Sequence, residues 1–187
     1  MTQPFSVKRV QAEGNLAWLD LEMTGLDAQR DVILQAALII TNGELQVLEE
    51  FSVDIWQPEQ ELAKMTPFVR DMHEKSGLLA RLRGSKIDNG AAEQRLLERV
   101  TGHCPYPAVL CGNTIGQDKR FIESRMPGLA GYLSYRTIDV SSIKLLAKAW
   151  YGSGAVFDKP KDREHDALFD VRNSIAELGH YKKTIFR

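Results

Sequence analysis

The stretch LAWLDLEMTGLD, residues Leu16–Asp27, places two acidic side chains inside a run of apolar residues. Its first eight residues, Leu16–Met23, have the pattern of a strand, so Asp20 and Glu22, two positions apart, share one side of it. An unpaired carboxylate in an apolar site costs several kcal/mol or shifts its pKa, and two neighbouring carboxylates also repel each other. Taken alone, the pair is explained most simply as exposed acids on an edge strand. Acidic partners elsewhere in the chain would instead indicate a shared site.

The segments after this strand predict an α/β fold. Two further strands, 31–41 and 45–56, are separated by Asn42-Gly43, a dipeptide typical of hairpin turns. We expect helices over 58–73 (interrupted near Pro67), 88–102, 117–126, 143–151 and 166–182, and short strands over 107–113 and 136–142. Strands first, then alternating helices and strands, predict a mixed sheet flanked by helices, with its first three strands antiparallel.

Length and composition predict one globular domain, residues 16–187, after a short polar lead-in at 1–15. A net charge of -1 argues against a large basic face for long nucleic acid, although a bound metal ion can supply positive charge locally. No apolar run approaches the roughly 18 residues of a membrane span, so no membrane partner is expected. Cys104 and Cys111 have no ligand-like spacing with histidine, which favours a reduced, cytoplasmic protein without disulfides.

A third acid, Asp118, follows the predicted strand 107–113 and begins a predicted helix. It stands three and four residues before Phe121 and Ile122, so it shares a helix face with them and leans toward the core. Alone, it could equally be a first-turn acid favoured by the helix macrodipole.

A fourth acid, Asp170, lies on the last predicted helix, next to the core position Val171. The apolar face of that helix repeats at spacings of three and four residues, in Leu168, Val171, Ile175 and Leu178. His165 lies just before the helix, at the end of the loop 152–164, whose glycine, proline and mixed charge predict mobility. Asp170 and His165 are not on one simple face, but they could flank a shared cleft.

Three elements thus each bring an acid to the rim of the core. Carboxylate oxygens of this kind suit Mg²⁺ or Mn²⁺, whose charge would offset the clustered acids. Two such ions, about 3.5 to 4 Å apart, can hold the attacking and leaving oxygens of a phosphodiester. His165, with an ordinary pKa near 6.5, could take a proton from the attacking water.

Four blocks of this chain, WLDLEMTGLD, CGNTIGQDKRF, YRTIDVSSIKLLAKAWY and HDALFDVRNSIAEL, resemble the oligoribonuclease family in the same order. That family belongs to the DEDD exonucleases that carry a histidine, on a ribonuclease H-like fold. The resemblance runs from about Leu16 to the end of the sequence. It implies 3′ to 5′ hydrolysis of very short RNA, especially dinucleotides, to mononucleotides, by a homodimer.

The resemblance also implies a role for individual residues. Two divalent ions, Mg²⁺ or Mn²⁺, would be bound by the four acids, with His165 as general base. The acids are Asp20, Glu22, Asp118 and Asp170. The bases of the substrate would be held by Leu26 and Phe68, and its terminal phosphate would lie near Thr114, Ser141 and Ser142. His73 matches a histidine on the substrate side of the site. Tyr135 and Arg136 would reach the site of the partner subunit.

The chain departs from the family pattern at four positions. Gln35 stands where the second strand usually carries Glu, Phe68 replaces a Trp, Phe169 replaces the acidic neighbour of Asp170, and Thr114 replaces a Ser. Base stacking is worth roughly 1 to 3 kcal/mol per base, so a smaller ring at Phe68 predicts weaker binding within that range. These departures bear on substrate preference more than on metal chemistry.

Alternatives remain at this stage. Without the resemblance, Leu26 and Phe68 would be interpreted as packing residues, and Tyr135 and Arg136 as surface residues. The same metal set would also serve an exonuclease that trims DNA or structured RNA ends. A diverged, non-catalytic nucleotide-binding protein is a further alternative, which the intact set of acids argues against.

Overall fold

The computed structural model describes residues 11–160 and 166–186, and a five-stranded mixed sheet forms the centre of this part of the chain. Its strand order is β3-β2-β1-β4-β5. The strands are β1 (Leu16–Met23), β2 (Ile33–Thr41), β3 (Val47–Asp54), β4 (Ala108–Gly112) and β5 (Leu133–Asp139). β2 is antiparallel to both β1 and β3, whereas β4 is parallel to β1 and β5. The predicted mixed sheet, with three antiparallel strands first, is confirmed.

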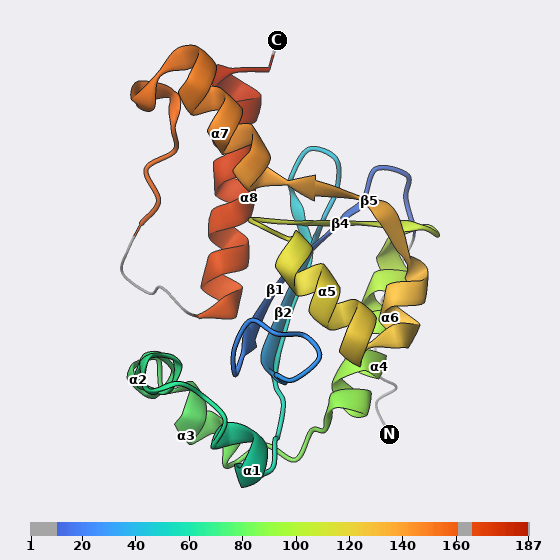
Figure 1. Ribbon diagram of the computed structural model, residues 1–187. Coiled ribbons are helices and arrows are strands. Elements are labelled where there is room, and N and C mark those ends of the chain that lie inside the picture. The colour runs from blue at the N-terminus through green and yellow to red at the C-terminus, as the bar shows by residue number, and fades with distance from the viewer. Residues whose placement is uncertain (1–10, 161–165, 187) are drawn as a thin grey trace, which may run out of the picture.

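Helices cover both faces of the sheet (Figure 1). They are α1 (Glu59–Leu62), α2 (Pro67–Lys75), α3 (Leu78–Leu82), α4 (Asn89–His103), α5 (Gly116–Arg125), α6 (Pro127–Tyr132), α7 (Val140–Tyr151) and α8 (Ala167–Thr184), with a 3-10 turn η1 (Ser153–Ala155). α4, α5 and α6 pack on one face through side chains such as Leu96, Phe121 and Leu129. α7 and α8 pack on the other face through Ala147 and Val171.

The alternation of side chains along β1 decides which face receives the acids. Leu19 and Leu21 are buried against the α4–α6 layer, whereas Trp18 is fully buried in the α7–α8 layer. Asp20 and Glu22 have the same parity as Trp18, so they point toward α8. β1 is the central strand of the sheet, with β2 on one side and β4 on the other. The interpretation of these acids as an exposed pair on an edge strand is therefore wrong.

The hairpin predicted at Asn42-Gly43 is present, but its geometry differs from the two-residue turn that this dipeptide favours. Asn42 accepts hydrogen bonds from the backbone N–H groups of Glu44 and Gln46 through its side-chain oxygen, at 3.0 Å each. The positive φ of 65° falls on Leu45, not on Gly43. The side chain of Asn42 thus organises a longer turn, and Leu45 takes the left-handed conformation.

Two short helices were not predicted. α3 has five residues and α6 has six, and α6 contains two glycines, so neither is long enough for a clear apolar period. The interruption at Pro67 is confirmed, because Thr66 caps α2 there by accepting from the N–H of Val69. In the part of the chain that the structure describes, no helix is long and apolar enough to cross a membrane. Cys104 and Cys111 are free and buried.

Gly112, at the end of β4, lies close to the backbone of β1. A Cβ at this position would lie 2.8 Å from Cδ1 of Ile115 and 3.0 Å from the backbone oxygen of Leu19. We predict that Gly112→Ala lowers the free energy of unfolding by about 1–3 kcal/mol, because the backbone atom cannot yield as a flexible side chain can. Denaturant unfolding measures this change.

A matched control is Gly131→Ala in α6, where a Cβ would meet nothing within 4 Å. That variant should be as stable as the parent chain or slightly more stable, because alanine is the better helix former. Equal stability of the Gly112→Ala variant and the parent would contradict the steric argument.

Candidate active site and metal centre

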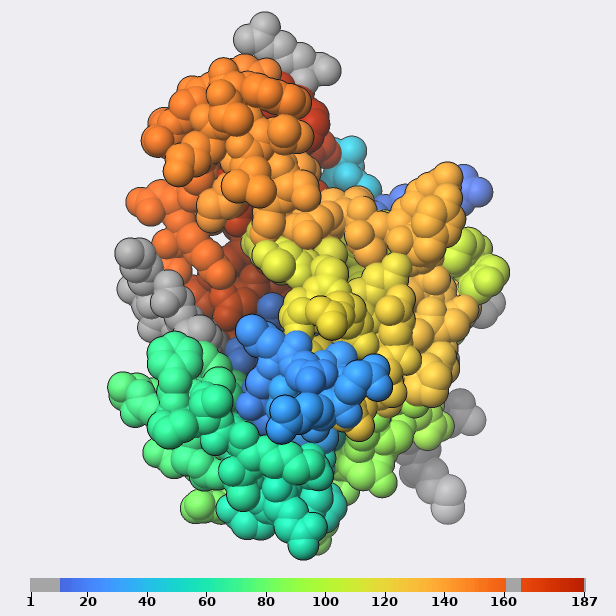
Figure 2. Space-filling view, viewed as in Figure 1, coloured from blue at the N-terminus to red at the C-terminus, as the bar shows by residue number. Residues whose placement is uncertain are grey.

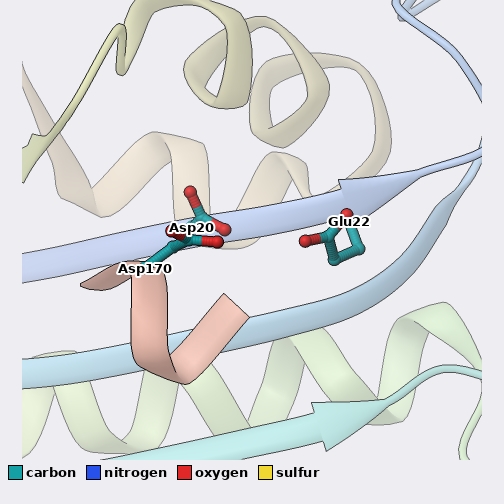
Figure 3. Close-up of side chains that lie close together, drawn as sticks. All are labelled: Asp20, Glu22 and Asp170. Carbon is teal, nitrogen blue, oxygen red and sulfur yellow. The ribbon is translucent and has the colours of Figure 1, made fainter. Parts of the chain in front are cut away.

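Carboxylate oxygens of Asp20 and Glu22 on β1 and of Asp170 on α8 all lie within 4.8 Å of one another. Figure 3 shows the side chains of Asp20 and Asp170 side by side, with Glu22 farther along the same strand. In the space-filling view, atoms of α8 (red) form the floor of a hollow, which is bordered by α5 (yellow), the loop after β1 (blue) and the segment after α7 (orange) (Figure 2). Three of the four predicted acids therefore form one cluster.

Asp118 joins this cluster because β1 and β4 separate. The two strands pair only from Leu16 to Trp18 of β1, which leaves later N–H groups of β1 without a ladder partner from β4. α5 begins in this gap, and Oδ1 of Asp118 accepts from the N–H of Leu21 at 3.0 Å. Asp118 is 6% exposed, so the prediction that it faces the core is confirmed.

Burial and mutual repulsion raise the pKa values of three of these acids. Burial is the largest cause at Asp20, followed by the charges of Asp118, Glu22 and Asp170, and the pKa rises well above its ordinary value. Burial, and then Asp170 and Asp118, raise the pKa of Glu22 to about 8. Burial raises the pKa of Asp118 to about 7, although backbone N–H groups oppose this shift. The cluster therefore holds protons near neutral pH unless a cation is bound.

Lys159 supplies one positive charge to the cluster, which sequence reasoning missed. Its Nζ lies 2.7 Å from Oδ1 of Asp170, and its charge lowers the pKa of Asp20, as the smallest of the effects acting there. Lys159 belongs to the loop 152–164, where mixed charge gave no signal that one lysine turns inward. His165, the expected general base, lies outside the described residues. Asp166, the next residue, caps α8 by accepting from the N–H of Phe169 at 3.2 Å.

His73 is fully buried behind Glu22, which differs from its expected place at the substrate. Its Nε2 lies 2.9 Å from the carbonyl oxygen of Met23, and its Nδ1 lies 3.8 Å from Oε2 of Glu22. Because a carbonyl oxygen only accepts, Nε2 carries the proton, which directs Nδ1 toward Glu22. In this structure His73 lies beside a carboxylate of the cluster and exposes no side-chain atom to a substrate.

Leu26 and Phe68, the two expected base contacts, are among the most exposed apolar residues, at 74% and 76%. Neither is a core residue, so packing does not explain them. The loop that carries Leu26 is fixed from two sides. Nε2 of Gln117 donates to the carbonyl oxygen of Leu26 at 2.6 Å, and a Cβ at Gly25 would lie 2.4 Å from Oδ2 of Asp31. This loop therefore holds an exposed leucine on a rigid turn.

The residues expected at the terminal phosphate meet at the start of α7. The N–H of Thr114 donates to Oγ of Ser141 and to Oδ1 of Asp139, at 3.0 Å each, and Thr114 itself has a positive φ of 52°. Ser142 is the next residue of the same helix turn and is exposed. Asp139, which accepts a hydrogen bond from Thr114, also raises the pKa of Asp118. These hydroxyl-bearing residues therefore adjoin the acidic cluster.

Tyr135 and Arg136 lie on β5, at the edge of the sheet opposite β3. Both are exposed, and Cζ of Arg136 lies 4.8 Å from the centre of the Tyr135 ring. Exposure on an edge strand is compatible with a contact to another protein chain.

The donor set fits a hard divalent cation. Three carboxylates lie within 4.8 Å of one another, the charge of the fourth, Asp118, also acts on Asp20, and metal ions of this kind prefer oxygen ligands. A bound cation would displace the protons that burial holds on the acids, because metal ligation requires the ionised form.

The fold and this acidic site together define a nuclease of the exonuclease class. The family model described as Exonuclease matches residues 17–178. Exonuclease I of E. coli, solved with a dT13 oligonucleotide, has the same fold, with a TM-score of 0.74 at 17% identity, over 93% of this chain and 42% of that one.

Comparison with curated proteins narrows the class. The oligoribonuclease of Francisella tularensis is 42% identical over 178 residues, covering 94% of this chain and 98% of the relative. The oligoribonuclease of Vibrio parahaemolyticus is 44% identical over 179 residues, with the same coverage. The chain belongs to the oligoribonuclease family, and the expected ribonuclease H-like fold is confirmed.

The raised pKa values predict that the metal-free protein loses stability as the pH rises. The ordinary values are 3.8 for Asp118 and 4.5 for Glu22, and the folded values are about 7 and about 8. Between these limits the native state holds more protons than the unfolded chain, so the free energy of unfolding falls with increasing pH. We expect a lower melting temperature at about pH 8.5 than at about pH 6 in chelator.

The control for this pH effect is Glu22→Gln, which removes the group whose pKa is raised to about 8 and should flatten the decline. Added Mn²⁺ should raise the melting temperature of the parent chain more at the higher pH, where fewer protons compete. A melting temperature that rises with pH in chelator, in the parent but not in the Glu22→Gln variant, would contradict the assignment.

Proposed function

We propose that this protein is a 3′ to 5′ exoribonuclease that hydrolyses short oligoribonucleotides, especially dinucleotides, to 5′-mononucleotides. The observation that carries the proposal is the convergence of Asp20, Glu22, Asp118 and Asp170 in one buried cluster. The cluster occurs in a chain that is 42–44% identical to curated oligoribonucleases over nearly its full length.

The four acids would hold two divalent cations, Mg²⁺ or Mn²⁺. When bound, such ions polarise the phosphodiester and stabilise the attacking and leaving oxygens. The residues of the chain supply the rest. The imidazole of His165 would accept a proton from the attacking water, and the fixed carboxylates would determine where the scissile phosphate can sit.

The exposed residues around the cluster suit a substrate of very few nucleotides. Leu26 and Phe68 offer apolar surface to bases, and stacking on the Phe68 ring tolerates any base. Thr114, Ser141 and Ser142 would receive the terminal phosphate at the start of α7, where the helix N-terminus favours an anion. Contacts at both ends of a dinucleotide would favour short substrates over long ones.

We further propose that the protein acts as a homodimer. α7 exposes Leu145, Trp150 and Tyr151 at 68%, 69% and 60%, and β5 exposes Tyr135 at 76%. Large exposed apolar residues of this kind are typical of a protein–protein interface. A second copy bound here would bring Tyr135 and Arg136 to the neighbouring active site.

We predict that the purified protein converts a diribonucleotide to mononucleotides with Mg²⁺ or Mn²⁺, and that a chelator stops the reaction. His165→Ala should lower kcat by about 10² to 10⁴, the usual contribution of a general base. Product chromatography over a series of substrate lengths measures both effects, and the rate should fall as the substrate lengthens.

Metal binding without turnover would support a non-catalytic nucleotide-binding protein instead. A higher rate on DNA or on structured RNA than on diribonucleotides would support an end-trimming exonuclease. An unchanged rate in the His165→Ala variant would remove that residue from the role of general base.

A subunit-mixing experiment tests the proposed contribution across the dimer. Arg136→Ala and Asp118→Asn variants should each be nearly inactive alone. After mixing and exchange of subunits, about one quarter of the sites should combine intact acids from one subunit with an intact Arg136 from the other. Activity should therefore return to about a quarter of that of the parent.

The control mixes each variant with an Asp20→Asn variant. Asp20→Asn with Asp118→Asn should stay inactive, because neither subunit provides a complete acidic cluster. A protein that sediments as a monomer and is fully active would contradict the shared site. So would a mixture that regains no activity after exchange of subunits has been demonstrated.

A further inference from the structure

Three strands of the sheet align one polar row on the face that α8 covers. Glu22 of β1 pairs in register with Gln35 of β2, and Gln35 pairs with Asp54 of β3. Residues directly opposite each other on neighbouring strands point to the same face. The row is therefore carboxylate, amide, carboxylate, with the neutral Gln35 between two acids. Gln35 is 6% exposed, in a strand that is otherwise buried along its whole length.

Gln35 uses both ends of its amide. Its Nε2 donates to Oδ1 of Asp54 at 2.7 Å, and its Oε1 accepts from the N–H of Ala167 at 3.3 Å. Ala167 is the first residue of α8, and its N–H is one of the groups that a helix cannot satisfy internally. Gln35 thus links the sheet to the N-terminus of the helix that carries Asp170.

Asp54 fixes which way the amide points. A carboxylate only accepts, so it binds the NH₂ end of Gln35 and leaves the oxygen end for Ala167. Asp54 is itself held by Arg81, whose Nε lies 3.0 Å from Oδ2. The chain of contacts runs from Arg81 through Asp54 and Gln35 to α8, and each donor meets an acceptor.

We propose that Gln35 is a positioning residue for the metal centre: it holds the first turn of α8, and with it Asp170, at the distance from β1 that the cluster requires. Asp170 lies one turn into the helix, where its N–H donates to the carbonyl oxygen of Asp166 at 2.9 Å. Displacement of Ala167 would therefore move Asp170 relative to Asp20 and Glu22. This inference rests on the proposed role of the four acids as metal ligands.

The test compares Mn²⁺ affinity, measured by calorimetry, in the parent chain and in Gln35→Ala and Asp54→Ala variants. Residues that hold metal ligands in place typically account for 10–100-fold in affinity, so we expect about a 10-fold loss in Gln35→Ala. Asp54→Ala should lose less, because the amide remains but its direction is no longer fixed. With a diribonucleotide, kcat should fall while KM changes little.

Glu50→Ala is the matched control. Glu50 also lies on β3 and also ties that strand to α8, through a bidentate contact with Arg172. Its loss frees an arginine, as Asp54→Ala does, but leaves the contact at Ala167 intact. Mn²⁺ affinity in Glu50→Ala should match that of the parent chain, even where the melting temperature falls. Equal losses of affinity in Glu50→Ala and Gln35→Ala would overturn the proposal.

An exchange of the two groups keeps the test decisive if Gln35→Ala unfolds. Gln35→Glu alone sets a second carboxylate against Asp54. The double variant Gln35→Glu, Asp54→Asn restores one donor and one acceptor across the pair. Both variants carry the same added charge at position 35, and the double variant has one negative charge fewer at position 54. Because that loss by itself would weaken the binding of a cation, tighter binding by the double variant reports the restored contact between positions 35 and 54.

The double variant should bind Mn²⁺ more tightly than Gln35→Glu alone and return kcat to within about two-fold of the parent, since the paired geometry is restored. Equal affinity in the single and double variants would overturn the role of the pair. If the parent chain binds no Mn²⁺, the metal centre itself fails and this inference fails with it. If the parent binds and Gln35→Ala binds equally well, only the role of Gln35 fails.

Discussion

Repulsion between buried carboxylates is the constraint on which the site depends. Glu22 and Asp118 are buried and Asp20 is partly buried, and the charges of Asp118 and Glu22 disfavour that of Asp20. Several groups around the cluster carry full or partial positive charge and offset part of this repulsion. Asp118 and Asp170 stand in the first turns of α5 and α8, where the helix macrodipole favours an acid. A backbone N–H from Leu21 and the ammonium of Lys159 contribute further.

These compensations are incomplete, as the raised pKa values indicate, and the remaining negative charge would favour a bound cation. A site whose acids were fully neutralised by lysine or arginine would have no need of a metal ion. Here the protonated acids near neutral pH can exchange protons for a divalent ion, with release of protons to solvent. The metal-free fold is therefore less stable than its core alone would allow, and function takes precedence over stability at β1.

The sequence predicted the features that depend on local periodicity. The parity of Asp20 and Glu22, the core-facing position of Asp118 and the apolar stripe of α8 all follow from spacings of two, three or four residues, and the structure confirms them. The sequence could not predict contacts between distant segments. Nothing near Lys159 signals that it turns toward Asp170, and nothing near His73 signals that it lies behind Glu22, because each contact is fixed by the packing of whole elements. The positive φ at Leu45 was missed because the Asn42 side chain, not Gly43, organises the turn.

The departures from the family pattern concern charge more than shape. Gln35 and Phe169 are both neutral at positions where the family usually has an acid, and both adjoin residues of the acidic cluster: Gln35 pairs with Glu22 on the neighbouring strand, and Phe169 precedes Asp170. An additional carboxylate at either place would add to the repulsion that burial already magnifies. In this chain the nearest extra acid along the same row is Asp54, one strand farther from Glu22, where Arg81 pairs with it. The carboxylate of Asp54 thus stands outside the cluster and acts through its hydrogen bond with Gln35, so it can orient α8 without competing for the charge of a cation bound at the cluster.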